Sequence, residues 1–182
     1  MLITGGAKSG KSEFAESLAG AAEMPVVYLA TMPLISGDSQ LAEKIKRHKE
    51  RRPATWSTIE AERDLDGVVS KLPGGASVCL LDCLSLFVAN LLHDAGNQAI
   101  ANKEMEKRIL HQCTLLLAEM DKRSEINFLT VTNEVGSGVI PDNQLARQYI
   151  EVLGEVNKAF AREAATVWHC CVGIPTKIKG GQ

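Results

Sequence analysis

Short apolar segments alternate with longer amphipathic segments along the chain. The apolar segments predict strands over residues 1–4, 26–30, 78–82, 126–132 and 166–172, of which 26–30 and 78–82 are expected to be buried. A segment of alternating character predicts another strand over residues 55–60, and residues 173–179 predict an edge strand. The segments between them predict helices over residues 11–22, 38–50, 64–72, 84–92, 103–123 and 141–165. Strands that alternate with helices predict an α/β fold, in which a mostly parallel sheet has helices on both faces.

The turn between the first strand and the first helix carries a complete GxxxxGKS phosphate-binding loop, Gly5-Gly6-Ala7-Lys8-Ser9-Gly10-Lys11-Ser12. Its glycines allow a tight loop whose backbone N–H groups point at phosphate oxygens, and the start of the next helix adds partial positive charge. Lys11 is placed to reach the β- and γ-phosphates, and the Ser12 hydroxyl to bind Mg²⁺. A glycine-rich turn that matches by chance is disfavoured, because the strand, loop, helix context is also met. We therefore expect a P-loop NTPase-like fold.

Polar or flexible residues follow several of the predicted strands. In open α/β sheets, ligands bind beyond the carboxyl ends of the strands, so Ala30, Thr31 and Met32 are candidate nucleotide contacts. Asp82 ends a buried strand, which is how phosphate-loop enzymes place a carboxylate on Mg²⁺. The alternative is that Asp82 caps the next helix, and the phosphate loop favours the magnesium role. The glycine-rich turn at residues 133–138 is a further candidate site segment.

A basic segment surrounds His48 near the end of the second predicted helix. Six Lys or Arg residues crowd this histidine, at positions 44, 46, 47, 49, 51 and 52. Their charges disfavour the imidazolium and favour a neutral, nucleophilic ring, and they attract a triphosphate. Such a histidine could attack phosphorus. The alternative, an ordinary solvated helix end with His48 partly packed inside, is favoured when this segment is considered alone.

Composition narrows the class of protein. The 182 residues fit one domain over residues 1–182, and a net charge of −2 lacks the basic excess of a nucleic-acid-binding protein. The phosphate loop begins at Gly5 and leaves no room for a signal peptide, and the most apolar stretch, residues 78–92, is too short and interrupted to span a membrane. We therefore expect a cytoplasmic protein without a transmembrane segment.

Cysteines and the remaining histidines add little to the candidate chemistry. The five cysteines, at positions 79, 83, 113, 170 and 171, include an adjacent pair and no paired CxxC modules, so neither a disulfide framework nor a structural zinc site is expected. Most of them fit as small buried apolar residues. His93 and His111 are expected at the surface.

Several blocks together resemble one family, the bifunctional adenosylcobinamide kinase and adenosylcobinamide-phosphate guanylyltransferases of cobalamin biosynthesis. The resemblance runs nearly end to end, through ITGGAKSGKS, VVYLATM, IKRHKERRP, TWSTIEA, VCLLDCLSLFVANLL, VTNEVGSGVIPDNQLARQY and GIPTKIK. Family members often have two consecutive histidines where this chain has Arg47 and His48, and often glutamate where it has Asp82. The DxxG and NKxD signatures of guanine-specific GTPases are not met, which disfavours a signalling GTPase.

The resemblance implies two reactions at one nucleotide site. A γ-phosphate of ATP or GTP passes to adenosylcobinamide with Mg²⁺, and His48 becomes covalently guanylylated by GTP before GMP passes to adenosylcobinamide phosphate. It also implies a homo-oligomer, a trimer being favoured. The implied nucleotide contacts are residues 5–12, Ala30, Thr31, Met32, Lys49, Glu50, Arg51, Arg52, Glu60 and Asp82. Glu60 could accept hydrogen bonds from the N1 and N2 donors of guanine, which adenine does not offer in that pattern.

Two other classes of protein stay open. One is a small-molecule kinase without a covalent intermediate, and the other is a nucleotide-dependent switch that modifies no corrinoid. Labelling of the protein by α-labelled GTP discriminates among these classes.

Overall fold

The computed structural model describes residues 1–33, 43, 46, 49–94 and 103–181. Its strands are β1 Leu2–Gly5, β2 Val26–Ala30, β3 Ser57–Glu60, β4 Val78–Asp82, β5 Asn127–Asn133, β6 Val167–Cys171 and β7 Ile174–Lys179. Its helices are α1 Lys11–Ala21, α3 Leu65–Ser70, α4 Leu84–Asp94, α5 Lys103–Lys122 and α6 Gln144–Glu163. Most of the helix predicted over residues 38–50 lies outside the described residues. The other predicted strands and helices are present.

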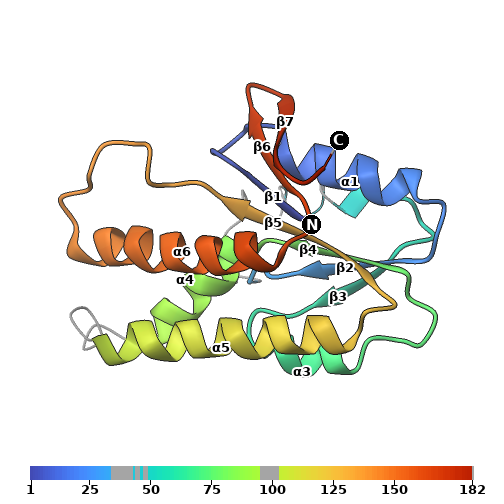
Figure 1. The fold of residues 1–182 in the computed structure, drawn as a ribbon, viewed down its shortest axis with the longest axis horizontal. Coiled ribbons are helices and arrows are strands. Elements are labelled where there is room, and N and C mark those ends of the chain that lie inside the picture. The colour runs from blue at the N-terminus through green and yellow to red at the C-terminus, as the bar shows by residue number, and fades with distance from the viewer. Residues whose placement is uncertain (34–42, 44–45, 47–48, 95–102, 182) are drawn as a thin grey trace.

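The strands form one sheet in the order β3-β2-β4-β5-β1-β6-β7 (Figure 1). Neighbouring strands from β3 to β6 pair in parallel, and β7 pairs antiparallel with β6 at one edge. The strand that leads into the phosphate loop, β1, therefore lies inside the sheet between β5 and β6. The sheet confirms the predicted α/β class and the predicted edge strand.

Helices cover both faces of the sheet, with α1 on one side and α3, α5 and α6 on the other (Figure 1). Ile3 and Leu80 lie in the core cluster that contains Ala15 of α1. Their neighbours in sequence, Leu2 and Leu81, lie in the second cluster, which contains residues of α3 to α6. Because successive side chains of a strand point to opposite faces, two buried faces explain why these strands are apolar throughout.

Two element boundaries differ from the prediction for identifiable reasons. α6 begins at Gln144 instead of residue 141, because the Asn143 side chain accepts a hydrogen bond from the Ala146 N–H at 3.1 Å and caps the helix. β3 begins at Ser57 instead of residue 55, because a turn precedes it, in which the Trp56 N–H donates to the Pro53 carbonyl at 3.0 Å.

The register aligns the carboxyl ends of four strands. Glu60 of β3 is paired with Ala30 of β2, and Ala30 with Asp82 of β4. On the other side of β4, Asp82 is paired with Val131 of β5, which continues beside the entrance of the phosphate loop. The sheet thus brings the predicted nucleotide contacts from β1, β2, β3 and β4 to one edge.

Candidate functional site

At two positions of the phosphate loop, neighbouring backbone lies so close that only glycine fits. Gly5 has φ of +157°, and a Cβ there would lie 2.4 Å from the Cys170 carbonyl oxygen and 2.5 Å from Ser9 Oγ. Gly10 has φ of +89°, a region that favours glycine, and its Cβ would lie 3.0 Å from Gly173 Cα. A side chain at either position would displace the loop or the strand end beside it.

The loop is held by hydrogen bonds from segments distant in sequence. The Gly5 carbonyl accepts from the Glu134 N–H at 3.0 Å, and the Ser9 carbonyl accepts from the Gly173 N–H at 3.0 Å. Glu134 follows β5 and Gly173 lies in the turn between β6 and β7. The shape of the loop therefore depends on both strands that flank β1.

Lys11 lies in the position that the motif predicts. It is buried, at 9% exposure, and its ammonium group donates to the Gly6 carbonyl within the loop at 3.0 Å. Gly10 precedes α1 and contributes no side-chain cap, so the first N–H groups of the helix are available to an anion. Ser9 Oγ is also buried, with no hydrogen-bond partner among the described residues. These groups have the arrangement of an anion-binding turn, and phosphate binding by them stays a prediction.

Asp82 is fixed by a tyrosine on the neighbouring strand. The Tyr28 hydroxyl donates to Asp82 Oδ2 at 2.6 Å. Burial and the Asp82 charge raise the pKa of Tyr28, so the phenol stays protonated and remains the donor. Because a carboxylate has two oxygens, Oδ1 can bind a cation while Oδ2 is held.

Asp82 and Ser12 fit a magnesium ion shared with a nucleotide. Both supply oxygen ligands, and protein-bound Mg²⁺ usually takes one or two protein ligands together with phosphates and water. Within the part of the chain that the structure describes, no group of three or more His, Cys, Asp or Glu could hold a metal ion alone. Burial raises the pKa of the Cys83 thiol, and the charges of Asp82 and Lys11 act on it in opposite directions. Cys83 and Ala15 of α1 belong to the same core cluster, so the end of β4 lies near α1.

Thr31 is completely buried, and its polar groups bind neighbouring backbone and side-chain groups. Its hydroxyl accepts from the Cys83 N–H and donates to the Cys83 carbonyl, both at 2.8 Å. Its carbonyl accepts from the Asn90 amide at 2.9 Å, and its N–H donates to the Asp82 carbonyl at 3.3 Å. Thr31 therefore positions the residues around Asp82, and a direct nucleotide contact from Thr31 stays a prediction.

The basic segment reaches the same edge of the sheet. Lys49 forms an ion pair with Glu60 at 2.5 Å, and Arg51 forms ion pairs with Glu13 and Glu16 of α1 at 3.0 and 3.2 Å. The sequence reasoning missed both α1 carboxylates, although two acids three residues apart after the phosphate loop are a signal for a basic partner. His48, Lys44 and Arg47 lie outside the described residues.

Charges in this segment are partly compensated. The Arg52 guanidinium lies 3.2 Å from the centre of the Tyr28 ring, as a cation–π contact. Burial raises the pKa of Glu16, although the charge of Arg51 lowers it. For Arg51, burial lowers the pKa, but the hydrogen bond to Glu13 and the charge of Glu16 outweigh burial and raise it. Arg51 and Arg52 of the basic segment thus make specific contacts with α1 and β2.

The cysteines give a direct test of the packing. All five are free thiols, and all but Cys171 are buried, as predicted for most of them. Burial raises the pKa of Cys79 and Cys113 to about 12, so these thiols stay protonated at pH 8. We expect Ellman's reagent to modify one thiol per native chain rapidly, and none rapidly in Cys171→Ser. A second rapidly reacting thiol in that variant would contradict the buried positions.

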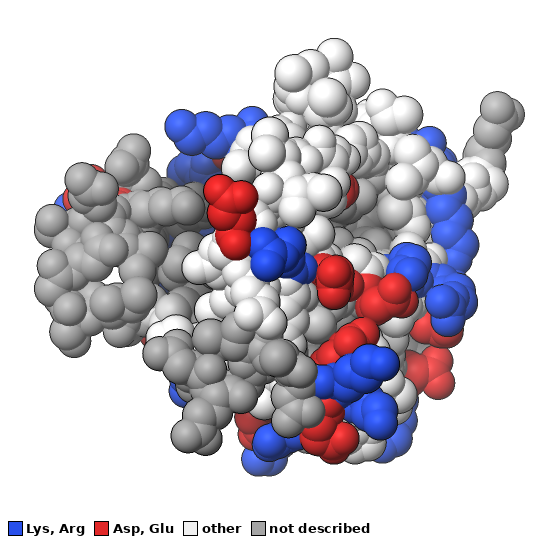
Figure 2. Space-filling model, turned by 90° about the vertical axis from the view of Figure 1, so that its left-hand side faces the viewer, with Lys and Arg blue, Asp and Glu red and all other residues white. Residues whose placement is uncertain are grey.

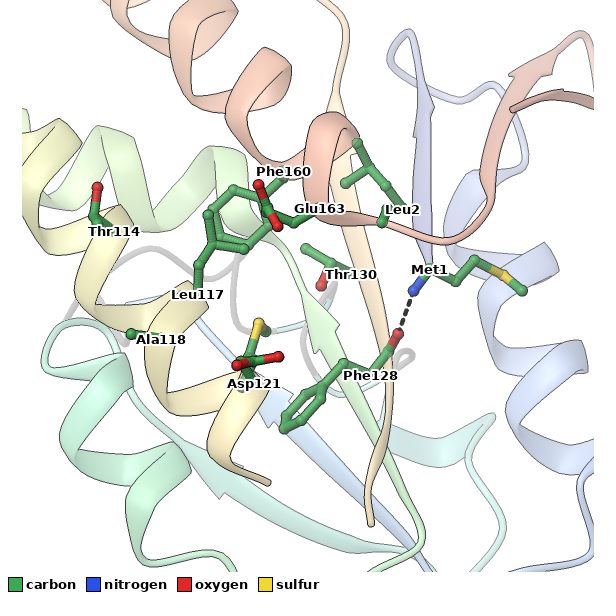
Figure 3. A pocket seen from close by; sticks show the side chains of 12 residues that line it. Met1, Leu2, Thr114, Leu117, Ala118, Asp121, Phe128, Thr130, Phe160 and Glu163 are labelled. Carbon is green, nitrogen blue, oxygen red and sulfur yellow. Dashed lines mark hydrogen bonds between the residues drawn. The ribbon is translucent and has the colours of Figure 1, made fainter. Parts of the chain in front are cut away.

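A cavity of about 500 Å³ lies near the amino ends of β1 and β5, between these strands and the helices α5 and α6 (Figure 3). Figure 3 shows the amino group of Met1 at its rim, where it donates to the Phe128 carbonyl at 2.8 Å. Its described lining residues include none of the predicted site residues. Because parallel sheets bind ligands at the carboxyl ends of their strands, we place the nucleotide at the phosphate loop and not in this cavity.

Of the helices that the structure describes, none combines the length and the apolar character that crossing a membrane requires.

Comparisons with known proteins agree on one family. Residues 1–178 match the family described as cobinamide kinase / cobinamide phosphate guanyltransferase. The bifunctional adenosylcobalamin biosynthesis proteins CobU of Salmonella typhimurium and Escherichia coli are 38% and 37% identical to this chain, each match covering 98% of this chain and 99% of the relative. A solved ATPase of a bacterial type III secretion system superposes with a TM-score of 0.61 at 9% identity, over 97% of this chain and 56% of the ATPase, a likeness of fold alone.

Proposed function

The chain belongs to the cobinamide kinase / cobinamide phosphate guanyltransferase family and is a bifunctional enzyme of adenosylcobalamin biosynthesis; we propose how its residues carry out the two reactions. The observation that carries the proposal is the phosphate loop at the carboxyl ends of the strands, with Lys11 inside the loop and Asp82 at the carboxyl end of β4. The basic segment is bound to the same edge. One nucleotide site can therefore serve both reactions.

In the kinase step, ATP or GTP binds with its phosphates against residues 5–12. The hydroxyl of the corrinoid aminopropanol arm attacks the γ-phosphorus, the bond to the β–γ bridging oxygen breaks, and the nucleoside diphosphate leaves. Lys11 and the loop N–H groups stabilise the negative charge on the transferring phosphoryl group. Ser12 and Asp82 would hold Mg²⁺, which supplies further charge stabilisation on the β- and γ-phosphates when bound.

In the guanylyltransferase step, His48 acts as the nucleophile. A neutral ring nitrogen attacks the α-phosphorus of GTP, a P–N bond forms, and pyrophosphate leaves. A phosphate oxygen of the corrinoid phosphate then attacks the same phosphorus, and the P–N bond breaks to give the corrinoid-GDP product and free histidine. Glu60 would accept from the N1 and N2 donors of guanine with the carboxylate that it shares with Lys49 at the end of β3.

Labelling of the protein tests this mechanism without a corrinoid. Incubation with α-labelled GTP and Mg²⁺ should leave label on the denatured protein, and γ-labelled GTP should leave none. Adding the corrinoid phosphate should discharge the α-label into the product. If turnover proceeds while no α-label is trapped, guanylyl transfer is direct and the covalent proposal fails.

We also propose, from the family resemblance, that copies of the chain assemble as a homo-oligomer, with a trimer favoured. Sedimentation of the purified protein measures this state directly.

A further inference from the structure

The loop between β5 and α6, residues 134–143, begins beside the phosphate loop, where the Glu134 N–H donates to the Gly5 carbonyl. It follows β5, which lies between β1 and β4, the strands that end at the phosphate loop and at Asp82. Figure 1 shows this loop projecting away from the body of the molecule before it returns to the start of α6. A molecule bound at the transferable phosphate would therefore have this loop as a neighbour.

Both ends of this β5–α6 loop are held by hydrogen bonds. At its start, the Glu134 N–H donates to Gly5, and Glu134 Oε1 accepts from the Gly136 N–H at 2.7 Å. At its end, the Arg147 guanidinium donates to the carbonyls of Pro141 and Asp142, both at 2.7 Å. Hydrogen bonds thus fix the two ends of the loop on either side of its tip.

The tip itself is uncharged and apolar. Val139 is 95% exposed and Ile140 is 78% exposed, so two adjacent aliphatic side chains extend into solvent. Residues 135–141 contain no ionisable side chain, and residues 136–140 are all exposed. Figure 2 faces the side toward which the loop projects and shows an uncharged area over the upper part of this face, with acidic and basic side chains across its middle and lower right.

We propose that the tip of the β5–α6 loop, centred on Val139 and Ile140, binds the corrinoid macrocycle of the acceptor substrate. The proposal rests on the proposed function, because the acceptor hydroxyl must reach the γ-phosphate while the much larger ring lies outside the phosphate loop. A corrinoid has methyl groups and neutral amide side chains around its rim. An apolar tip with accessible backbone groups complements that chemistry, whereas the basic segment complements a triphosphate.

A second copy of the chain has a different surface available. The hairpin of β6 and β7 exposes Val172, Ile174 and Ile178, and β7 forms one edge of the sheet. Edge strands present unpaired backbone groups to another chain. The hairpin therefore offers both apolar side chains and backbone partners for self-association, and the β5–α6 loop is left to the substrate.

The double variant Val139→Ser/Ile140→Ser tests the proposal. Because both side chains are exposed, their replacement should not affect folding. We expect the KM for cobinamide in the kinase assay to rise about tenfold or more, because two aliphatic contacts are lost. The KM for the nucleotide and the corrinoid-free labelling by α-labelled GTP should stay unchanged. An unchanged KM for cobinamide would overturn the proposal.

Two control variants separate the apolar contact from other effects. Val139→Ile/Ile140→Val keeps the apolar character and should keep the wild-type KM for cobinamide. Met24→Ser removes another exposed apolar side chain, which lies before the amino end of β2 and away from the carboxyl ends of the strands. This variant should also leave the KM for cobinamide unchanged. Light scattering after size exclusion measures the oligomer, and a smaller oligomer in the serine double variant would assign the tip to a second copy and overturn the proposal. Absence of α-label on the wild-type protein would instead contradict the covalent mechanism. The KM for cobinamide in the kinase assay would still test the role of the loop.

Discussion

Lys11→Ala is expected to reduce the rates of both reactions by about 10²- to 10³-fold, the cost of removing one preorganised group that stabilises transition-state charge. The ammonium group lies inside the phosphate loop, 3.0 Å from the Gly6 carbonyl, and no other described lysine occupies the loop's buried interior. Both reactions use the phosphates of a nucleotide bound there, so kinase turnover and α-labelling of the protein should fall together.

Lys122→Ala is the matched control for this variant. Lys122 is exposed at the end of α5, where it pairs with Glu119, and its loss should change neither rate. Thermal unfolding without nucleotide distinguishes a loss of phosphate contact from a loss of folding. Normal kinase turnover in Lys11→Ala, with a folded protein, would falsify the role proposed for this lysine.

His48→Ala is expected to separate the two activities. Guanylylation needs the ring nitrogen as nucleophile, so α-label on the protein should fall below detection and guanylyl transfer should stop. The kinase step transfers the γ-phosphate directly to a hydroxyl and should continue within about tenfold of the wild-type rate. A filter-binding assay with α-labelled GTP and a corrinoid phosphorylation assay measure the two outcomes.

His111→Ala controls for the loss of any histidine, because His111 is exposed on α5. The wild-type label should also be released by acid and retained in alkali, as expected of a phosphorus–nitrogen bond. If α-label persists in His48→Ala, the nucleophile is another residue and the assignment is wrong.

The order of strands and helices could be predicted because each element has its own local pattern. Val78 to Asp82, for example, is an apolar run that ends in a carboxylate, and β4 has those boundaries. The phosphate loop was likewise evident because its residues are adjacent in sequence. Among the described residues, the predictions differ from the structure at the ends of elements. At Asn143, for example, a side-chain cap sets the start of α6 three residues later than predicted.

Contacts between distant segments could not be predicted in the same way. The pairing of Arg51 with Glu13 and Glu16 depends on how the segment after His48 packs on α1, and the charges alone do not specify a partner. The sequence suggested an uncompensated basic cluster around a nucleotide. In the structure, Lys49 and Arg51 are already paired with acids, so the proposed phosphate contacts require these pairs to open or to be shared.

The two hydrogen bonds that hold the phosphate loop have a consequence for the order in which the protein folds. The loop follows β1, which pairs with β5 and β6, and the Ser9 carbonyl accepts a hydrogen bond from Gly173, which follows β6 and is distant in sequence. Such non-local pairing is slow to form and late by necessity. The phosphate loop therefore reaches its folded shape only after β5 and β6 have paired with β1 on either side.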